Sequence, residues 1–541
     1  MGLLSRLFDA VACLTVAAAA VILWDPPFGT RGNEIYVSLH GSNWKSGASP
    51  ELALRTIQRA ADIALPGDRV IILPGTYFER VHVRRGGTTG RPVRFEAFDP
   101  GTVIVSGALP EAVPSDWKWI SEGDGIWSTE TRCPVYALSA DGQVLFRVPW
   151  GGLKWLRELV SRPNAWGAFY YENHRLFVFL RGRGHPADGR LVAHVEVPEP
   201  REWGEFKSAN IWVEADHVVF SGLQFEMGIG SGLLVWNAED VLIRECAFSG
   251  ATFGVKCGRG AKPAYKVSVE NCLYHNFPQY LWHRDWLSWV ECYAGYPYSS
   301  LIAAVDDGTR VSNNLVAHAG DGLQISTRDV TIYEGADISG NWLTLCTDDA
   351  IELDGHAQRV HFHDNVVFEC HEGVSASPVI SGPVLVEENL FLNPSDGING
   401  AQLKLISTQV SPASLDMHPI RNLEYRRNAA FGNWLCWSSP GLIENIQVHD
   451  NVFCTAHQTV PPWPAGVEAR HNVVSTVTTP AVAVSEMIRQ MQAAAAHDSA
   501  LGAVVRRNAR RLTIRPGPTW LNWNQCDATR GLLELVERHD P

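Results

Sequence analysis

The segment Val360-His361-Phe362-His363-Asp364-Asn365 is one copy of a unit that recurs from Val219 to Val474. Each copy ends on one column of residues, and the intervals between neighbours are 20 to 27 residues, apart from one of 39. Three positions earlier the residue is almost always apolar, and five positions earlier it is usually aliphatic. This is the period-2 pattern of a short strand that ends in a polar turn. The column is Gly222, Cys246, Cys272, Cys292, Asn314, Asn341, Asn365, Asn389, Asn428, Asn451 and Asn472.

A repeat of this length, carrying short strands, predicts a solenoid. One coil cannot bury its apolar face alone, so stacked coils must share a continuous core. Asn tolerates the left-handed conformation that a sharp bend needs, and stacked amides about 4.8 Å apart hydrogen-bond along the axis. Cysteines fit the same position as small buried residues, so we expect mostly buried thiols, with Cys246 and Cys272 as the pair best placed to bond.

The pattern resembles the right-handed parallel β-helix proteins of the pectate-lyase-like superfamily. The resemblance implies an all-β fold of eleven or more coils. The stretch Glu34–Gly107 resembles the N-terminal cap of such proteins, in which a helix covers the first coil. Here Ser49-Pro50 predicts a helix start and Pro66-Gly67 its end. Strands are expected at Val70–Leu73, Val81–Val83, Val93–Ala97 and Val103–Val105.

The chain divides into five parts by pattern. Residues 1–24 predict a signal peptide or signal anchor, because an uncharged run from Ala10 to Trp24 follows Arg6. Residues 34–107 form the cap and first coils, and residues 108–205 break the period, which indicates an inserted small β subdomain. Residues 206–475 carry the repeats, and residues 476–541 predict a helix and a C-terminal cap. The leader predicts export to a periplasmic, membrane-anchored or extracellular location.

Charge excludes one class of partner. The net charge is −13 and basic runs are absent, so nucleic acid is not an expected ligand. The 20 tryptophans fit either a β core or exposed platforms for sugar rings.

Acidic residues form a second column, seven or eight positions after the ladder, in four consecutive coils. Four carboxylates about 5 Å apart cannot all ionise without compensation. A hard cation such as Ca²⁺, a basic neighbour or raised pKa values would supply it. The predicted metal-ligand set is Asp321, Asp349, Glu372 and Asp396.

The densest coil adds Glu352 and Asp354, which alternate with Ile351 and Leu353 and are therefore expected on one outward face. Outward carboxylates suit general acid/base cleavage of glycosides. The predicted catalytic set is Asp321, Asp349, Glu352 and Asp354, and the predicted substrate-binding set is Lys256, Trp282, Arg284, Gln324 and His356.

Two histidines of this region, His361 and His363, share an outward face, which fits either a transition-metal site or solvated side chains. The resemblance and the acids together predict an exported enzyme that cleaves a polysaccharide, as a glycoside hydrolase or a polysaccharide lyase. The alternative is a non-catalytic envelope protein whose groove binds glycan, since acid-Gly corners are also ordinary turn chemistry.

Overall fold

The computed structural model describes residues 32–108, 117–131, 134–141, 143–148, 151–163, 165–189, 191–195, 209–228, 230–258, 264–275, 299–303, 308–325, 335–393, 402–406, 419–432, 435–438, 443–455, 462–477 and 484–522. The predicted leader lies outside these residues. Within them, no helix is long and apolar enough to cross a membrane.

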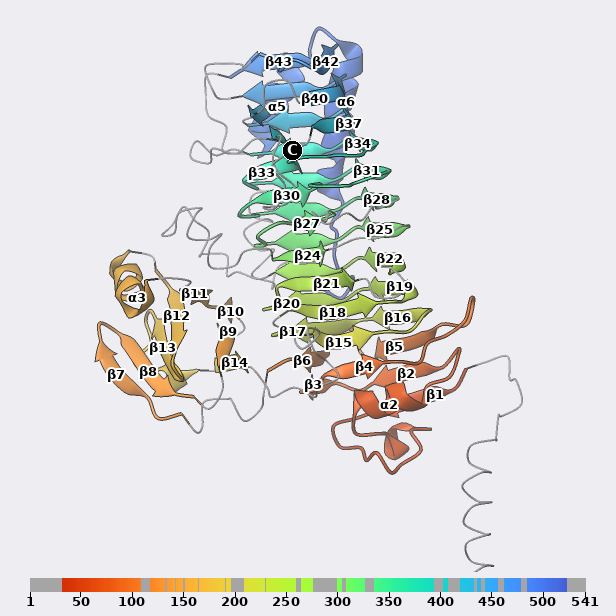
Figure 1. Ribbon diagram of the computed structural model, residues 1–541, viewed down its shortest axis with the longest axis vertical. Coiled ribbons are helices and arrows are strands. Elements are labelled where there is room, and N and C mark those ends of the chain that lie inside the picture. Colours follow the sequence, from red (N-terminus) through yellow and green to blue (C-terminus); the bar gives the residue numbers. More distant parts are fainter. Residues whose placement is uncertain are drawn as a thin grey trace, which may run out of the picture.

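Most of the described chain forms a parallel β-helix with three long sheets, as the repeat predicts (Figure 1). Each coil contributes one short strand to each sheet in turn, so strands that are neighbours in a sheet come from successive coils. In the described residues, sheet A has 13 strands: β1 (Glu34–Val37), β2 (Arg69–Ile72), β5 (Val93–Ala97), β16 (Val218–Ser221), β19 (Glu239–Arg244), β22 (Tyr265–Glu270), β25 (Thr309–Ser312), β28 (Ala336–Ser339), β31 (Val360–His363), β34 (Val384–Glu387), β37 (Ile420–Arg426), β40 (Ile443–His449) and β42 (Val467–Arg470).

Sheet B follows sheet A in every coil and has 12 described strands: β3 (Gly75–Tyr77), β6 (Val103–Ser106), β17 (Leu223–Glu226), β20 (Ala247–Ser249), β23 (Leu273–His275), β26 (Leu315–Ala317), β29 (Trp342–Thr344), β32 (Val366–Phe368), β35 (Leu390–Leu392), β38 (Ala429–Phe431), β41 (Val452–Thr455) and β43 (Val473–Thr476).

Sheet C completes the coil, with 10 described strands: β4 (Val81–Val83), β15 (Ala209–Val213), β18 (Ser231–Trp236), β21 (Phe253–Gly258), β24 (Ser300–Ala303), β27 (Leu323–Gln324), β30 (Asp349–Glu352), β33 (Glu372–Ala376), β36 (Leu403–Ile406) and β39 (Leu435–Ser438).

The core is one continuous apolar column inside the three sheets, because alternate residues of every strand point inward. Aromatic side chains of successive coils stack along this column. The rings of Phe95 and Phe220 are 5.3 Å apart, and those of Phe225 and Phe248 are 5.2 Å apart. Stacking of identical positions is what allows a parallel solenoid to grow beyond the size of an ordinary domain core.

The asparagine ladder and its amide hydrogen bonds along the axis are confirmed, but the left-handed conformation expected at the asparagine itself is not. Asn341 donates from Nδ2 to Asn365 Oδ1 at 2.9 Å, and the Asn341 backbone N donates to the same oxygen at 2.9 Å. The same pair of bonds links each ladder residue to the next from Asn314 to Asn472. The left-handed conformation belongs to the residue before the ladder position, for example Asp364 with φ 58°. Asn is therefore needed for its buried donor and acceptor.

One ladder assignment is wrong by one position. Strand pairing places Ser221 beside Arg244 and Gln224 beside Ala247, so Leu223 rather than Gly222 occupies the ladder position of its coil. Gly222 has φ 74° and fills the left-handed position that Glu245 fills in the next coil. The cysteines are also corrected: Cys246 and Cys272 are buried, free thiols.

The N-terminal cap contains a shorter helix than predicted. Pro50–Leu52 form one 3-10 turn, and α2 spans Ile57–Ile63 with Thr56 as its N-cap, accepting from the Arg59 backbone N. Leu54 is extended between the two, because its N–H donates to Tyr36 O and its carbonyl accepts from Ser38 N, both at 2.8 Å. The four strands expected after the helix are all present.

The insertion after β6 forms two small sheets and a helix beside the N-terminal coils (Figure 1). A five-stranded sheet contains β7 (Ile120–Gly123), β8 (Ile126–Glu130), β11 (Phe146–Arg147), β12 (Gly167–Glu172) and β13 (Arg175–Leu180). A three-stranded sheet contains β9 (Val135–Ala140), β10 (Gln143–Val144) and β14 (Leu191–Val195). The helix is α3 (Gly152–Ser161), which packs on β12.

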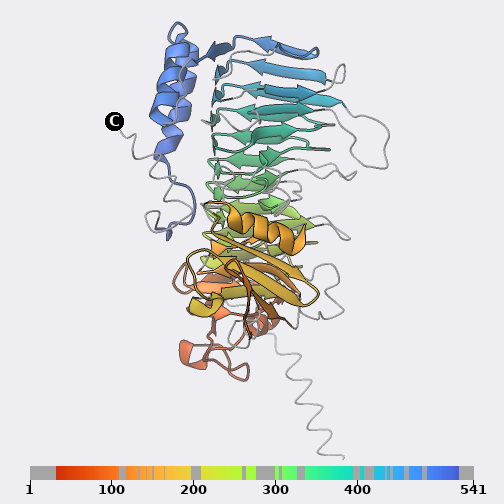
Figure 2. The same ribbon diagram turned by 90° about the vertical axis from the view of Figure 1, so that its left-hand side faces the viewer.

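The C-terminal helices lie along the flank of the solenoid (Figure 2). Helices α5 (Val484–Ala494) and α6 (Ser499–Ala509) pack on the outer face of sheet B, where Met487 and Met491 are fully buried. The tail then runs back toward earlier coils, where the Trp520 indole donates to Glu245 O at 2.7 Å. These helices cover the apolar outer face of sheet B, so they do more than cap an end.

Candidate functional site

The predicted acids meet where sheet B turns into sheet C. Asp321 immediately precedes β27, Asp349 begins β30 and Glu372 begins β33. Because the coils stack in register, Asp349 pairs directly with Glu372, and the Asp349 backbone N lies 3.3 Å from Asp321 Oδ1. We call Asp321, Asp348, Asp349, Glu352 and Glu372 the acid corner.

Asp348 is the one member of the acid corner that is in neither the predicted catalytic set nor the predicted metal-ligand set. Oxygens of Asp321, Asp348 and Asp349 all lie within 4.8 Å of one another. Asp321 and Asp349 are buried, whereas Asp348 is partly exposed. Asp348 could have been found from its position next to Asp349, but the predicted column took only one acidic residue from each coil.

Lys404 brings a positive charge to the site, and no pattern in the sequence singles it out. Its ammonium lies 3.1 Å from Asp349 Oδ1 and 3.3 Å from Asp349 Oδ2. Strand pairing places Gln324, Glu352, Ser375 and Lys404 side by side in one outward row of sheet C. Lys404 precedes Asn428 in the coil with the 39-residue interval, where the repeat register is hardest to follow.

Burial and crowding change the protonation of the acids. Burial, then the charges of Asp349 and Asp321, raise the pKa of Asp348 to about 9, although Lys404 opposes the rise. Burial, then Glu352 and Asp349, also raise the pKa of Asp321 well above its ordinary value. At neutral pH the site therefore holds protonated Asp348 close to the Asp349 carboxylate, which an ammonium at this distance stabilises as an anion.

Lys404 itself stays protonated. Burial acts to lower its pKa, but Asp349, Asp348, Glu372 and Asp354 outweigh burial, and the pKa is raised. An ammonium with this many acidic neighbours carries its proton throughout the physiological range.

Two histidines near the acids are neutral. Burial, helped by Lys404, lowers the pKa of His371 to about 4, and His371 Nε2 lies 4.0 Å from Glu372 Oε1. Burial, helped by His275, lowers the pKa of His318 to about 3. Both ring nitrogens of His318 are buried and have no hydrogen-bond partner among the described residues.

Asp354 differs from the prediction. It is only 3% exposed and accepts from the Ser377 backbone N at 2.8 Å and from Ser375 Oγ at 3.3 Å. Strand β30 ends at Glu352, so the alternation that would point Asp354 outward does not continue. Glu352 remains in the outward row, and Asp354 instead binds the next coil.

The predicted substrate-binding residues are spread more widely. Gln324 Nε2 donates to Asp321 Oδ2 at 2.6 Å, so Gln324 is in direct contact with the acid corner. Lys256 is exposed in the same outward row, two strands from Gln324 with Ala303 between them. His356 lies beyond β30, with Nδ1 3.0 Å from Ser381 Oγ. Trp282, Arg284 and Asp396 lie outside the described residues.

Asp321, Asp348 and Asp349 lie close enough to share a cation, and Ca²⁺ binding at the acid corner stays a prediction. Calcium takes six to eight oxygen ligands. Here both oxygens of Asp349 face the Lys404 ammonium, and the two oxygens of Asp321 accept from Gln324 Nε2 and the Asp349 backbone N. In this arrangement the Lys404 ammonium compensates part of the negative charge.

Comparison with known proteins places the fold. Residues 209–399 match the family model described as a right handed beta helix region. A *Bacillus subtilis* (strain 168) protein named "Uncharacterized protein YwoF" is 37% identical over 76 residues, which are 14% of this chain and 16% of that protein. The aligned part therefore spans under a fifth of that relative's length.

Solved structures agree on the architecture. The complex structure of XylC with xylose superposes with a TM-score of 0.51 at 13% identity, covering 82% of this chain and 86% of the other. Pectate lyase Pel9A superposes with a TM-score of 0.42 at 11% identity, covering 84% of this chain and 82% of the other. The described chain thus folds as a parallel β-helix, and its residues 209–399 match a right handed beta helix region.

Proposed function

We propose that the chain is a glycoside hydrolase that cleaves a polysaccharide at the acid corner. The observation that carries the proposal is a protonated, partly exposed carboxyl, Asp348, in one corner with a second partly exposed carboxyl, Glu352, and with Asp349, which an ammonium stabilises as an anion. Glycoside hydrolysis needs one acid and one carboxylate that flank the same bond.

The roles follow from the protonation states. Asp348 gives its proton to the oxygen of the leaving sugar, which would otherwise depart as an unstable alkoxide. Glu352, the partly exposed carboxyl of the same corner, acts on the sugar carbon, either by activating water or by direct attack. Asp349 is buried, and its ion pair with Lys404 supplies a fixed negative charge behind it. Asp321, which is buried and holds Gln324, positions Asp349 through the backbone contact at 3.3 Å.

A hydrolase is favoured over a lyase because of Lys404. Lyase chemistry needs a basic residue that removes a proton next to a uronate carboxylate. Lys404 is ion-paired and its pKa is raised, so it does not act as that base. The acid corner would also repel a uronate, since the described residues bring one lysine to several carboxylates.

Sheet C is the face on which an extended glycan fits. The outer face of sheet B is covered by α5 and α6. On sheet C, Lys256 is exposed and Glu352 is partly exposed, whereas Trp212, Leu234, Ala303 and Gln324 of the same row are buried. One outward row of sheet C runs from Trp212 through Leu234, Lys256, Ala303 and Gln324 to Glu352. Five strand spacings make this row about 24 Å long, which suits a polymer rather than a single sugar.

Incubation of the purified chain with neutral and acidic polysaccharides, xylan among them, tests the proposal. New reducing ends without an unsaturated product support a hydrolase. Absorbance from an unsaturated uronate would show a lyase and overturn the assignment. Binding without cleavage would favour the non-catalytic alternative, and Asp348→Asn then serves as the control for any trace activity.

We also propose export of the chain. The uncharged run from Ala10 to Trp24 after Arg6 supports it, and polysaccharide substrates are found outside the cell. Fractionation of cells that express the full chain, with N-terminal sequencing of the product, tests both export and cleavage of the leader.

A further inference from the structure

A second cluster of ionisable side chains lies on the outer face of sheet A. Asp337 on β28 pairs directly with His361 on β31, and His363 follows on the same face of β31. The two imidazole rings stack with their centroids 3.9 Å apart. One oxygen or nitrogen from each of the three residues lies within 4.8 Å of the others.

One ring nitrogen of each histidine contacts a carboxylate oxygen. His361 Nε2 lies 2.9 Å from Glu387 Oε1, and His363 Nδ1 lies 2.8 Å from Asp364 Oδ2. Arginines bind these carboxylates in turn: Arg426 and Arg427 pair with Glu387, and Arg511 pairs with Asp364. Because an ion-paired carboxylate can only accept, the facing ring nitrogen of each histidine donates, and the opposite nitrogen is the one that can bind an ion by releasing any proton it carries.

A carboxylate bound to each histidine, and arginines bound to each carboxylate, form the kind of arrangement that orients the histidine ligands of a metal. A ligating imidazole almost always donates its other N–H to a carboxylate or carbonyl, which sets its tautomer and ring orientation. His363 Nε2 lies 3.5 Å from Asp337 Oδ2. That separation is long for a hydrogen bond but close to the roughly 3.4 Å between two ligand atoms of a tetrahedral Zn²⁺ site.

We propose that Asp337, His361 and His363 bind a divalent transition metal of the Zn²⁺ type. Two imidazoles and one carboxylate suit this class of ion better than Ca²⁺ or Mg²⁺, which prefer oxygen ligands alone. The three side chains are 50%, 36% and 21% exposed, so an ion reaches them from solvent and keeps a coordination position open to water.

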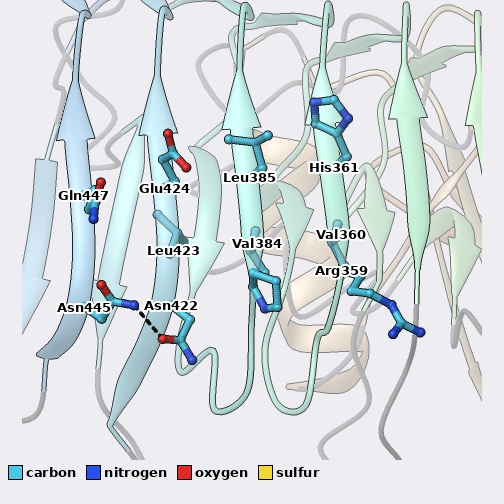
Figure 3. A pocket seen from close by; sticks show the side chains of 11 residues that line it. Arg359, Val360, His361, Val384, Leu385, Asn422, Leu423, Glu424, Asn445 and Gln447 are labelled. Carbon is cyan, nitrogen blue, oxygen red and sulfur yellow. Dashed lines mark hydrogen bonds between the residues drawn. The ribbon is translucent and has the colours of Figure 1, made fainter.

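The ion would lie at the rim of a groove. His361 is one of the residues that line a hollow of about 450 Å³ over β31, β34, β37 and β40 (Figure 3). Polar side chains of Glu424, Asn445 and Gln447 line its other side, and Leu385 lies between His361 and Glu424.

The same chain contains a natural control for the site. His449-Asp450-Asn451 repeats the sequence His363-Asp364-Asn365, and His449 Nε2 lies 3.1 Å from Glu424 Oε1. Gln447 stands two residues before His449, where His361 stands before His363. His471 also contacts Asp450, but the described residues around His449 do not bring three ligand atoms together as the proposed site does.

Metal titration of the full chain without an affinity tag tests the inference. After treatment with chelator and desalting, calorimetry with ZnCl₂ should show one saturable ion per chain, and Co²⁺ should give the visible absorption of a tetrahedral site. His361→Gln and His363→Gln should each abolish this binding. Asp364→Asn should weaken it about 10- to 100-fold, as loss of an outer partner does.

His449→Gln is the matched control and should bind Zn²⁺ as the unmodified chain does. Circular dichroism of each variant verifies folding, which these outward side chains should leave unchanged. Absence of saturable binding in the unmodified chain would overturn the inference, as would equal binding by both His361→Gln and His363→Gln. The measurement needs no polysaccharide, so its outcome is separate from that of the proposed hydrolase activity.

Discussion

The same coils carry two stacked polar columns, and the two behave in opposite ways. In the amide column, Asn341, Asn365 and Asn389 each donate to the next coil and accept from the previous one. In the acid corner, seven or eight residues further on, Asp321, Asp349 and Glu372 stack at the same spacing but can only accept unless protonated.

The difference shows what stacking demands of a side chain. An amide has both a donor and an acceptor, so identical copies satisfy one another and the column needs nothing else. Ionised carboxylates repel at this spacing, so the acid corner depends on protons and on Lys404. The amide column, whose members satisfy one another, stabilises the fold. The acid corner contains side chains with perturbed pKa values, which is typical of sites that carry out chemistry.

The sharpest test removes the proton donor. Asp348→Asn keeps the shape of the side chain but cannot supply a proton, so kcat/KM should fall by about 10²- to 10⁴-fold. Rates on a cleaved polysaccharide, measured as reducing ends, check this expectation. Glu239→Gln, which changes an exposed acid on sheet A, is the control and should retain activity. Comparable rates for both variants would move the catalytic site away from the acid corner.

Breaking the amide column should damage stability instead of activity. Asn365→Ala removes the amide that pairs with Asn341 and Asn389 and that donates to the Ile338 carbonyl. Because buried polar groups then lose their partners, the free energy of unfolding should drop by about 3 to 5 kcal/mol. Urea denaturation gives the value. Gln447→Ala, an outward polar side chain on β40, should change it by less than about 0.5 kcal/mol. Similar losses for the two variants would refute the role of the ladder.

The two columns should also respond differently to pH. The folded pKa of Asp348, about 9, lies above the unfolded value of about 3.9, so the folded state binds more protons. Stability from this group is full below about pH 4 and is lost as pH rises toward about 9. Urea midpoints at pH 5 and pH 8 measure the loss. Asp348→Asn should flatten the dependence, and Lys404→Gln should steepen it, while Gln447→Ala should leave the slope as it is.

The smallest effect is expected from chelation at the acid corner. The test uses His363→Gln, which removes the proposed sheet A metal site, so that EDTA reports on the acid corner alone. Because Lys404 serves as the counter-charge of Asp349, EDTA should leave the melting temperature of this variant unchanged. Differential scanning calorimetry with and without EDTA at pH 7 measures this. A clear fall in melting temperature would show that the acid corner does hold a cation.

Local regularity explains which expectations were confirmed. Most coils are 20 to 27 residues long, and each repeats the inward apolar positions and the ladder residue. These features lie within one coil, so comparison of a few coils of sequence shows them. The error at Gly222 has a physical origin, because both glycine and asparagine accept a left-handed conformation and the two adjacent positions look alike. The predicted helix from Ser49 failed for a different reason: strand-like bonds of Leu54 with β1 override its helical spacing.

The sequence by itself determined a parallel solenoid, its ladder and the corner where acids gather, since each of these depends on residues within one or two coils. Only the tertiary structure decided which charges meet. Lys404 lies 55 residues from Asp349 in the chain, and Asp364 is bound by Arg511 from the C-terminal tail. Such contacts depend on the stacking register and on how the tail folds back over the coils. Protonation follows from those contacts and from burial, so the choice between proton, lysine and metal at each site had to come from the structure.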